Sequence, residues 1–270
     1  MSQRINLVCV NGIVGVRSQP DPQSEQLTEL LFNESFLAES EHEGLVLGVT
    51  EADGIRGYAP RAAFLPKSGR PTHRVRQPIV HVYTAPDLRG PWLLMLPMNA
   101  LVELTGRASF LRSLPVNDKV RFVELHTGGW VAECCLVDAK QFETSPEAVA
   151  RSFVGTPYLH GGKTRLGCDG AGLIQTVMAA CGLAIPRQLS AQRKYFEDQS
   201  QRTQLTKQSA PSAALFYSSE RCGFLFNADI ISANPETMQV DVTSFEEFRE
   251  IERTSGSPLS IFPLPVIKSQ

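Results

Sequence analysis

The chain has 270 residues and a formal net charge of −2, with 26 Lys and Arg residues against 28 Asp and Glu. This length accommodates two or three compact domains, and a hydrophobic content of 42% excludes a disordered or fibrous protein. Without a basic excess, the chain is not expected to bind nucleic acid or an anionic membrane surface through its charge.

Neither a membrane span nor a metal site is predicted. The N-terminal apolar stretch is too short for a secretory signal, and no apolar run approaches the ~20 residues of a spanning helix. The six cysteines lack Cys-x-x-Cys pairs and histidine partners at zinc-site spacing. We therefore expect a cytoplasmic protein without membrane insertion, whose cysteines are reduced and mostly buried, with no metal and no cofactor.

Short strands separated by turns are predicted for residues 1–70. They lie at residues 5–10, 27–32, 35–39, 46–49 and 57–59. Strands this short, joined by turns with Gly, Pro and Asn, favour a small β-barrel. The run from Asp53 to Tyr58, Asp-Gly-Ile-Arg-Gly-Tyr, resembles the element that closes the barrel of bacterial SH3 domains.

A second copy of this pattern covers residues 71–141. It begins in the polar segment 69–73, and its strands are predicted at residues 80–83, 94–98, 100–104 and 128–131. The spacing indicates a divergent internal repeat of about seventy residues, and hence a second SH3-like barrel. Trp130 is expected in the core or rim of this barrel, with a role in an interface as the alternative.

Residues 142–270 combine helix and strand signals. Ser145 and Pro146 mark the start of a helix that runs to Phe153. Asp169 can cap a second helix, whose apolar residues fall on one stripe until Gly182 ends it. The remaining predicted elements are strands at residues 213–217, 221–226 and 232–234, a helix with a capping box at 244–247, and an extended tail at 259–267.

The start of the second helix is built like a reactive-cysteine site that lacks its cysteine. A thiol in the first turn of such a helix would be stabilised as the thiolate by the helix dipole and by free backbone N–H groups. Gly170 stands where that thiol would be, and glycine provides no nucleophile.

This segment resembles the NlpC/P60 family of bacterial cell-wall peptidases. These papain-like cysteine enzymes carry the motif Tyr-x-Trp-Gly-Gly, a short loop, and Asp-Cys-Ser-Gly-Leu. The matching residues are Tyr158, Gly161, Gly162, Asp169, Gly172 and Leu173. The family's Trp, Cys and Ser are replaced by His160, Gly170 and Ala171. Residues 182–187, with Ser190 and Gln192, resemble a further family stretch. The resemblance implies an α+β fold, with helices packed on an antiparallel sheet after the two SH3-like barrels.

The resemblance also implies positions for the other catalytic groups. The catalytic histidine of the family aligns with Arg221, and the residue that orients it aligns with Ser232, with an ambiguity of one residue. An arginine remains protonated at ordinary pH, so it cannot accept a thiol proton. With Gly170, Arg221 and Ser232 at the three positions, the chain is interpreted as a pseudoenzyme.

In family members with SH3 domains, the resemblance implies binding of the free amine of a peptidoglycan stem peptide. The motif Asp and Tyr and a surface of the first SH3 domain would form that site. The candidate binding residues are Tyr158, Asp169, Ala171, Arg221, Asp53 and Tyr58. Two alternatives stay open: Asp169 could serve only as a helix cap, and Arg221 could bind an anion or simply extend into solvent.

The leading hypothesis is a non-catalytic relative of these peptidases that binds a peptide, a muropeptide or a protein partner. The alternative is an active hydrolase of the γ-D-Glu-diamino acid bond that uses a relocated pair, Cys168 and His160. Cys168 precedes the cap and adjoins Asp169, whose charge would raise the pKa of the thiol, so this alternative ranks lower. A third hypothesis is a regulatory partner of an active paralogue, with its groove closed.

Overall fold

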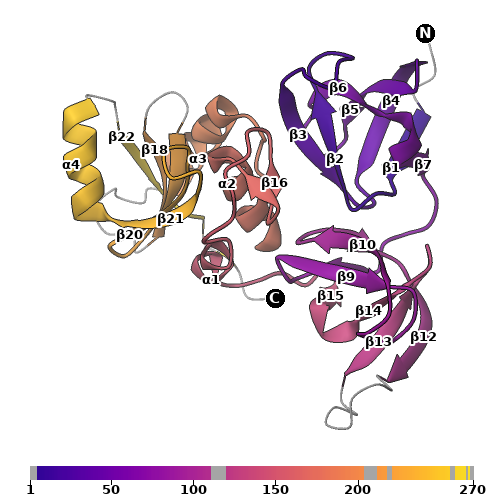
Figure 1. Ribbon diagram of the computed structural model, residues 1–270. Helices are drawn as coiled ribbons and strands as arrows, with labels where there is room; N and C mark the ends of the chain where they lie inside the picture. The colour runs from indigo at the N-terminus through magenta and orange to yellow at the C-terminus, as the bar shows by residue number, and fades with distance from the viewer. Residues whose placement is uncertain are drawn as a thin grey trace. The chain divides into compact units, whose positions relative to one another are not determined.

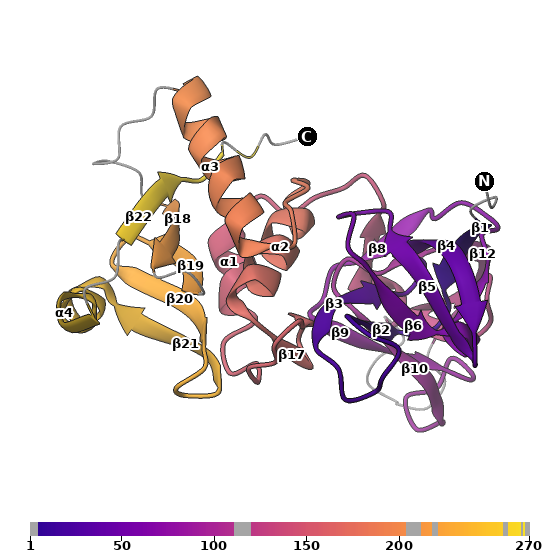
Figure 2. The ribbon, with the colours of Figure 1, turned by 90° about the horizontal axis from the view of Figure 1, so that it is seen from above.

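A computed structural model describes residues 5–110, 120–203, 212–217, 221–255, 259–265 and 267. The chain divides into two units, Met1–Gln141 and Phe142–Gln270 (Figures 1 and 2). The first unit is built from β-strands, and the second combines helices with a sheet. This confirms the expectation of mixed helix and sheet structure with mostly antiparallel strands.

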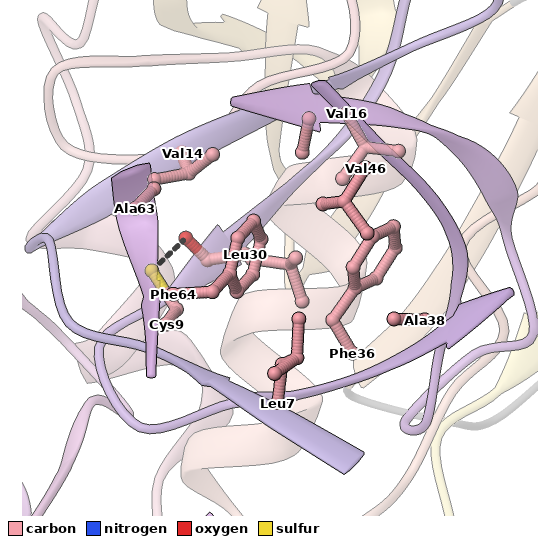
Figure 3. Close-up of a cluster of buried hydrophobic side chains, with 11 residues drawn as sticks. Leu7, Cys9, Val14, Val16, Leu30, Phe36, Ala38, Val46, Ala63 and Phe64 are labelled. Carbon is pink, nitrogen blue, oxygen red and sulfur yellow. Dashed lines mark hydrogen bonds between the residues drawn. The ribbon is translucent and has the colours of Figure 1, made fainter. Parts of the chain in front are cut away.

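The first half of unit one, which we call the first β lobe, spans residues 5–66. Its sheet has the strand order β3-β2-β6-β5-β4-β1-β7. The strands are β1 (Ile5–Cys9), β2 (Ile13–Arg17), β3 (Gln26–Leu31), β4 (Ser35–His42), β5 (Leu45–Thr50), β6 (Arg56–Pro60) and β7 (Phe64–Pro66). Alternate side chains point inward and form one apolar core (Figure 3). At its centre the rings of Phe36 and Phe64 stack with their centroids 5.2 Å apart.

The second β lobe spans residues 73–138. Its strands are β8 (His73–Val75), β9 (Ile79–Tyr83), β10 (Trp92–Pro97), β11 (Leu101–Val102), β12 (Leu104–Phe110), β13 (Arg121–Leu125), β14 (Trp130–Ala132) and β15 (Leu136–Asp138). They form a sheet of order β10-β9-β14-β13-β12 and a smaller sheet β11-β8-β15. Trp130 does not belong to the apolar core, because its neighbour Val131 points inward and the indole therefore points outward.

Both lobes end in the same local pattern. In the first lobe, β6 leads through the 3-10 turn η1 (Arg61–Ala63) into β7. In the second lobe, β14 leads through η2 (Glu133–Cys135) into β15. The two lobes therefore end with the same order of strand, 3-10 turn and strand.

The second unit has a five-stranded antiparallel sheet of order β21-β20-β19-β18-β22. Its strands are β18 (Ser212–Tyr217), β19 (Arg221–Phe226), β20 (Asp229–Asn234), β21 (Gln239–Ser244) and β22 (Leu259–Pro263), and a hairpin is formed by β16 (Lys163–Thr164) and β17 (Gly167–Cys168). The helices are α1 (Pro146–Arg151), α2 (Gly170–Ala180), α3 (Leu189–Thr203) and α4 (Phe245–Ser255). In Figure 2 the sheet lies between α4 and the group α1, α2 and α3. No helix in the described part of the chain is long and apolar enough to cross a membrane.

Local signals explain where two of these helices begin and end. Ser145 caps α1 by accepting a hydrogen bond from the backbone N–H of Ala148, and Pro146 occupies the first turn. Asp169 caps α2, and Gly182 ends it with a φ of +84°, a conformation that favours glycine. The predicted tail forms an edge strand over residues 259–263, because β22 pairs along β18.

Candidate functional site

Asp169 holds together the segment that leads into α2. One carboxylate oxygen, Oδ1, accepts a hydrogen bond from the N–H of Gly172 at 2.7 Å. The other, Oδ2, accepts from the N–H of Gly161 at 2.8 Å and from Nη2 of Arg187 at 2.6 Å. The side chains of Asp169 and Arg187 are only 11% and 5% exposed. The pair therefore fixes the helix start, the preceding turn and the segment after α2 in one buried contact.

These contacts give Asp169 a structural role within the protein. A carboxylate offers about four acceptor positions, and three hydrogen bonds from the unit itself already use both oxygens. The capping role that the sequence left open is therefore present in the structure. A ligand ammonium at Asp169 would have to compete with the buried guanidinium of Arg187.

Gly170 begins α2 directly against strand β19. A Cβ atom added to Gly170 would lie 2.8 Å from the backbone oxygen of Cys222 and 3.0 Å from its Sγ atom. Real Cβ atoms essentially never approach other atoms more closely than 3.0 Å. Cys222 is 1% exposed, so the space that a nucleophilic side chain would need at position 170 is filled.

The Cys222 thiol faces the start of α2 but is not activated by it. Burial raises the pKa of this thiol well above its usual value, and the charge of Asp169 raises it further, while Arg187 partly opposes the shift. A helix N-terminus lowers the pKa of an accessible thiol, but here the loss of hydration dominates. At neutral pH Cys222 is therefore a protonated, buried thiol.

Arg221 lies on the opposite face of the sheet, which corrects the expected arrangement by one residue. Side chains alternate along a strand, so Arg221 shares its face with Tyr217, its partner on β18, while Cys222 points toward α2. Nη2 of Arg221 donates to Oε1 of Glu236 at 2.7 Å. The structure thus does not bring the guanidinium to the start of α2, where an anion site was considered.

Ser232 also lies on the face away from α2. It is opposite Gly223 in the β19–β20 register and hydrogen-bonds Tyr217, whose pKa is raised to about 12 by burial. On the α2 face, β20 instead presents Ile231 and Ala233, both buried and apolar. Neither side chain can orient or accept a proton beside Cys222.

The remaining motif residues lie in the turn and hairpin before α2 and in its first turn. Tyr158 is half-buried, and its N–H donates to the backbone oxygen of Met238 at 2.9 Å. Ala171 is buried, and its carbonyl accepts a hydrogen bond from Gln192 at 2.8 Å. His160 is exposed, whereas Cys168 has an exposed fraction of 0%. A thiol this deeply buried cannot reach a substrate without local opening of the hairpin.

Large apolar side chains are exposed beside Tyr158 in the chain, on the turn between β16 and β17, and just before β21. The exposed fractions are 41% for Leu159, 50% for Leu166 and 59% for Met238. Leu159 packs over Gly167 of the hairpin, and the backbone oxygen of Met238 accepts a hydrogen bond from the N–H of Tyr158. We refer to Leu159, Leu166 and Met238 as the apolar rim.

Asp53 and Tyr58 belong to the first unit, whereas the candidate residues described above belong to the second. Asp53 accepts a hydrogen bond from the hydroxyl of Thr50 in the turn between β5 and β6. Tyr58 lies half-buried on β6, opposite Leu47 of β5 and Arg17 of β2.

Sequence reasoning missed the role of Cys222, which it treated as one of several small buried residues. The signal was present in the strand itself. Cys222, Phe224 and Phe226 form an apolar series of period two, and this series predicts that they share the buried face while Arg221 points the other way.

Comparison with known proteins found one family model that matches part of the second unit and solved structures that cover nearly the whole chain. Residues 155–217 match the model of the NlpC/P60 family. An NlpC/P60 family protein from Bacillus cereus ATCC 10987 superimposes with a TM-score of 0.72 at 12% identity, covering 97% of this chain and 100% of that chain.

An NlpC/P60 endopeptidase from Photobacterium damselae subsp. piscicida has a TM-score of 0.54 at 14% identity, covering 96% of this chain and 70% of that chain. At such identities the likeness shows the fold alone. No curated protein matches the sequence.

Proposed function

We propose that this chain, whose second unit belongs to the NlpC/P60 family, is a non-catalytic relative of the family's cell-wall peptidases. In this proposal it binds a peptide, a muropeptide or a protein partner beside the vacant nucleophile position. The observation that carries the proposal is the contact between Gly170 and Cys222.

That contact supports a loss of cysteine-peptidase chemistry at its first step. Covalent catalysis needs a nucleophile and a base within hydrogen-bond reach. Position 170 has neither a side chain nor space for one, and the facing thiol of Cys222 is buried and protonated. The neighbouring side chains on the same face, Ile231 and Ala233, cannot act as bases.

The surface around this position supports retained binding. The frame formed by Asp169, Arg187 and Gly161 keeps the turn after Tyr158 in place, although no reaction depends on it. The apolar rim leaves three large side chains exposed, on the segments that flank and pair with Tyr158 and on the turn between β16 and β17. Exposed apolar groups of this kind mark surfaces that bind other molecules.

Hydrolysis is tested with stem peptides that contain L-Ala-γ-D-Glu linked to a diamino acid. We expect no release of new amines by mass spectrometry, under conditions in which an active NlpC/P60 endopeptidase cleaves the same peptides. Turnover abolished by Cys168→Ser would establish the relocated pair instead. Turnover abolished by Cys222→Ser would show that the packing at Gly170 does not keep substrate away from the Cys222 thiol.

Binding is tested with the same stem peptides by calorimetry on the full chain. We expect saturable binding that Tyr158→Ala weakens by at least about tenfold, the effect of losing one well-made contact. Tyr195→Ala, which removes a half-buried tyrosine on α3, is the matched control and should leave binding unchanged. Equal effects of the two substitutions would place the ligand elsewhere.

A further inference from the structure

The turn between strands β14 and β15 of the second β lobe carries two adjacent cysteines, Cys134 and Cys135. Both belong to the 3-10 turn η2. Cys134 is exposed, Cys135 is half-buried against the core of the lobe, and the other four cysteines of the chain are buried. The pair therefore holds the accessible thiols of the protein. Because it belongs to the first unit, its role is separate from the function proposed above.

The shape of the turn brings the two thiols together. Neighbouring side chains on a β-strand point to opposite faces, whereas in a 3-10 turn they are rotated by only about 120°. The pKa of Cys135 is raised to about 11, first by burial, then by the charge of the Cys134 thiol and by a hydrogen bond with it. This interaction places the two sulfur atoms within reach of one ligand.

The fold of the turn requires neither thiol. The turn that ends the first β lobe, η1, has Ala62 and Ala63 where η2 has Cys134 and Cys135. The residue before each turn has nearly the same backbone angles, with φ −62° and ψ 126° in the first lobe and φ −64° and ψ 125° in the second. Ala62 is exposed and Ala63 is buried, so alanine suits both positions. Packing alone therefore does not explain two adjacent thiols.

A direct bond between the two sulfurs fits the turn poorly. Adjacent Cα atoms lie about 3.8 Å apart, whereas those of disulfide-bonded residues usually lie about 4.4–6.8 Å apart, and departures from this range store strain. An atom held between the sulfurs enlarges the ring and removes that constraint. Soft centres such as Cu(I) prefer thiolate sulfur, and both Cu(I) and trivalent arsenic are held stably by two sulfurs. Structural zinc takes four ligands, which is more than two thiols supply.

We propose that Cys134 and Cys135 form a dithiol site for a soft, thiophilic centre held by two sulfurs, of the kind represented by Cu(I) and trivalent arsenic. The exposed Cys134 binds first, and Cys135 closes the chelate. With an organic arsenic(III) oxide, two As–S bonds replace the bonding between arsenic and oxygen, and the two thiol protons leave with the oxygen as water. With Cu(I), both protons pass to solvent. Neither reaction changes an oxidation state.

The experiment offers each centre to the reduced full chain. With phenylarsine oxide at one equivalent, mass spectrometry should show one phenylarsenic group gained and two protons lost, and iodoacetamide should no longer label Cys134. Dimercaptopropanol should release the group, whereas mercaptoethanol at the same thiol concentration should not, because a monothiol forms no chelate. Competition with a colorimetric chelator measures the affinity for Cu(I). Uptake of only one of the two probes identifies the centre that the site takes.

Variants distinguish a chelate from single thiols. Cys134→Ala and Cys135→Ala each leave one sulfur and should weaken retention of the probe at least about a hundredfold, since linking two contacts strengthens binding by about 10²–10⁴. The two substitutions together reproduce the Ala-Ala turn of the first lobe, so this variant should fold, as tryptophan fluorescence can show, and bind neither probe. Cys181→Ala removes a buried thiol of the second unit and should leave binding unchanged. The proposal fails if neither probe binds, if Cys135→Ala retains the probe as well as the unsubstituted chain does, or if the double variant still takes it up.

Discussion

A side chain at position 170 should destabilise the second unit, because the start of α2 has no space for one. In Gly170→Ala, the new Cβ would lie 2.8 Å from the backbone oxygen of Cys222, which cannot rotate away. Overpacking of this kind costs about 1–3 kcal/mol, and the better helix propensity of alanine returns at most about 1 kcal/mol. We expect a net loss of about 1–2 kcal/mol in the free energy of unfolding.

Urea unfolding of the full chain measures this loss, since the two units report through different signals. All four described α-helices belong to the second unit, so far-UV circular dichroism follows that unit. Both tryptophans belong to the first, so their fluorescence should stay unchanged. Gly90→Ala is the matched control, because a Cβ there meets its nearest atom at 3.4 Å, an ordinary contact.

A double-mutant cycle identifies the cause of the loss. Cys222→Ala removes the Sγ atom that would lie 3.0 Å from the new Cβ, but it leaves the backbone oxygen in place. Gly170→Ala should therefore cost less in the Cys222→Ala background, with a coupling of about 0.5–1 kcal/mol. A neutral or stabilising Gly170→Ala would refute the close packing of α2 on β19 and, with it, the basis of the proposed loss of catalysis.

Four further predictions concern a buried ion pair, a helix cap and the burial of thiols. Arg187→Met leaves the buried carboxylate of Asp169 without its ion pair and should cost about 3–5 kcal/mol in urea unfolding. Ser145→Ala removes the cap of α1 and should cost about 1 kcal/mol by the same assay. Iodoacetamide should label the exposed Cys134 in the native protein and Cys222 only after unfolding, as peptide mass spectrometry can show. Because the pKa of Cys222 is raised in the folded state, the thiol loses its proton first in the unfolded chain. Stability should therefore fall as pH rises above about 8.5, and this fall should be smaller in Cys222→Ala.

Local chemistry made α1 and α2 predictable from the sequence. Ser145, Asp169 and Gly182 act on the backbone within a few residues of themselves, so their roles do not depend on distant parts of the chain. Helix α3 lacks such a signal. Among its residues Leu189–Gln199 only Gln192 and Phe196 are buried, so it shows no apolar stripe that would distinguish it from a polar loop.

The face of β19 could not be fixed by matching the family pattern. Which side chains of β20 share a face with those of β19 depends on the register between the two strands, and a shift of one residue exchanges the two faces of β20. The turn at 227–228 sets this register, and it pairs Gly223 with Ser232. Arg221 and Ser232 consequently lie together on the face away from α2, whereas the family pattern placed both beside Gly170.

The motif around Asp169 persists for a reason that does not require catalysis. Its carboxylate joins the turn at Gly161, the start of α2 and Arg187, and loss of any one contact leaves a buried charge poorly compensated. These residues therefore report that the fold is intact, whether or not a peptide is cleaved. Whether covalent catalysis is possible depends instead on position 170 and on Cys222, the residue of β19 that faces it. The glycine packed against a buried thiol at that contact is the observation on which the proposed loss of catalysis rests.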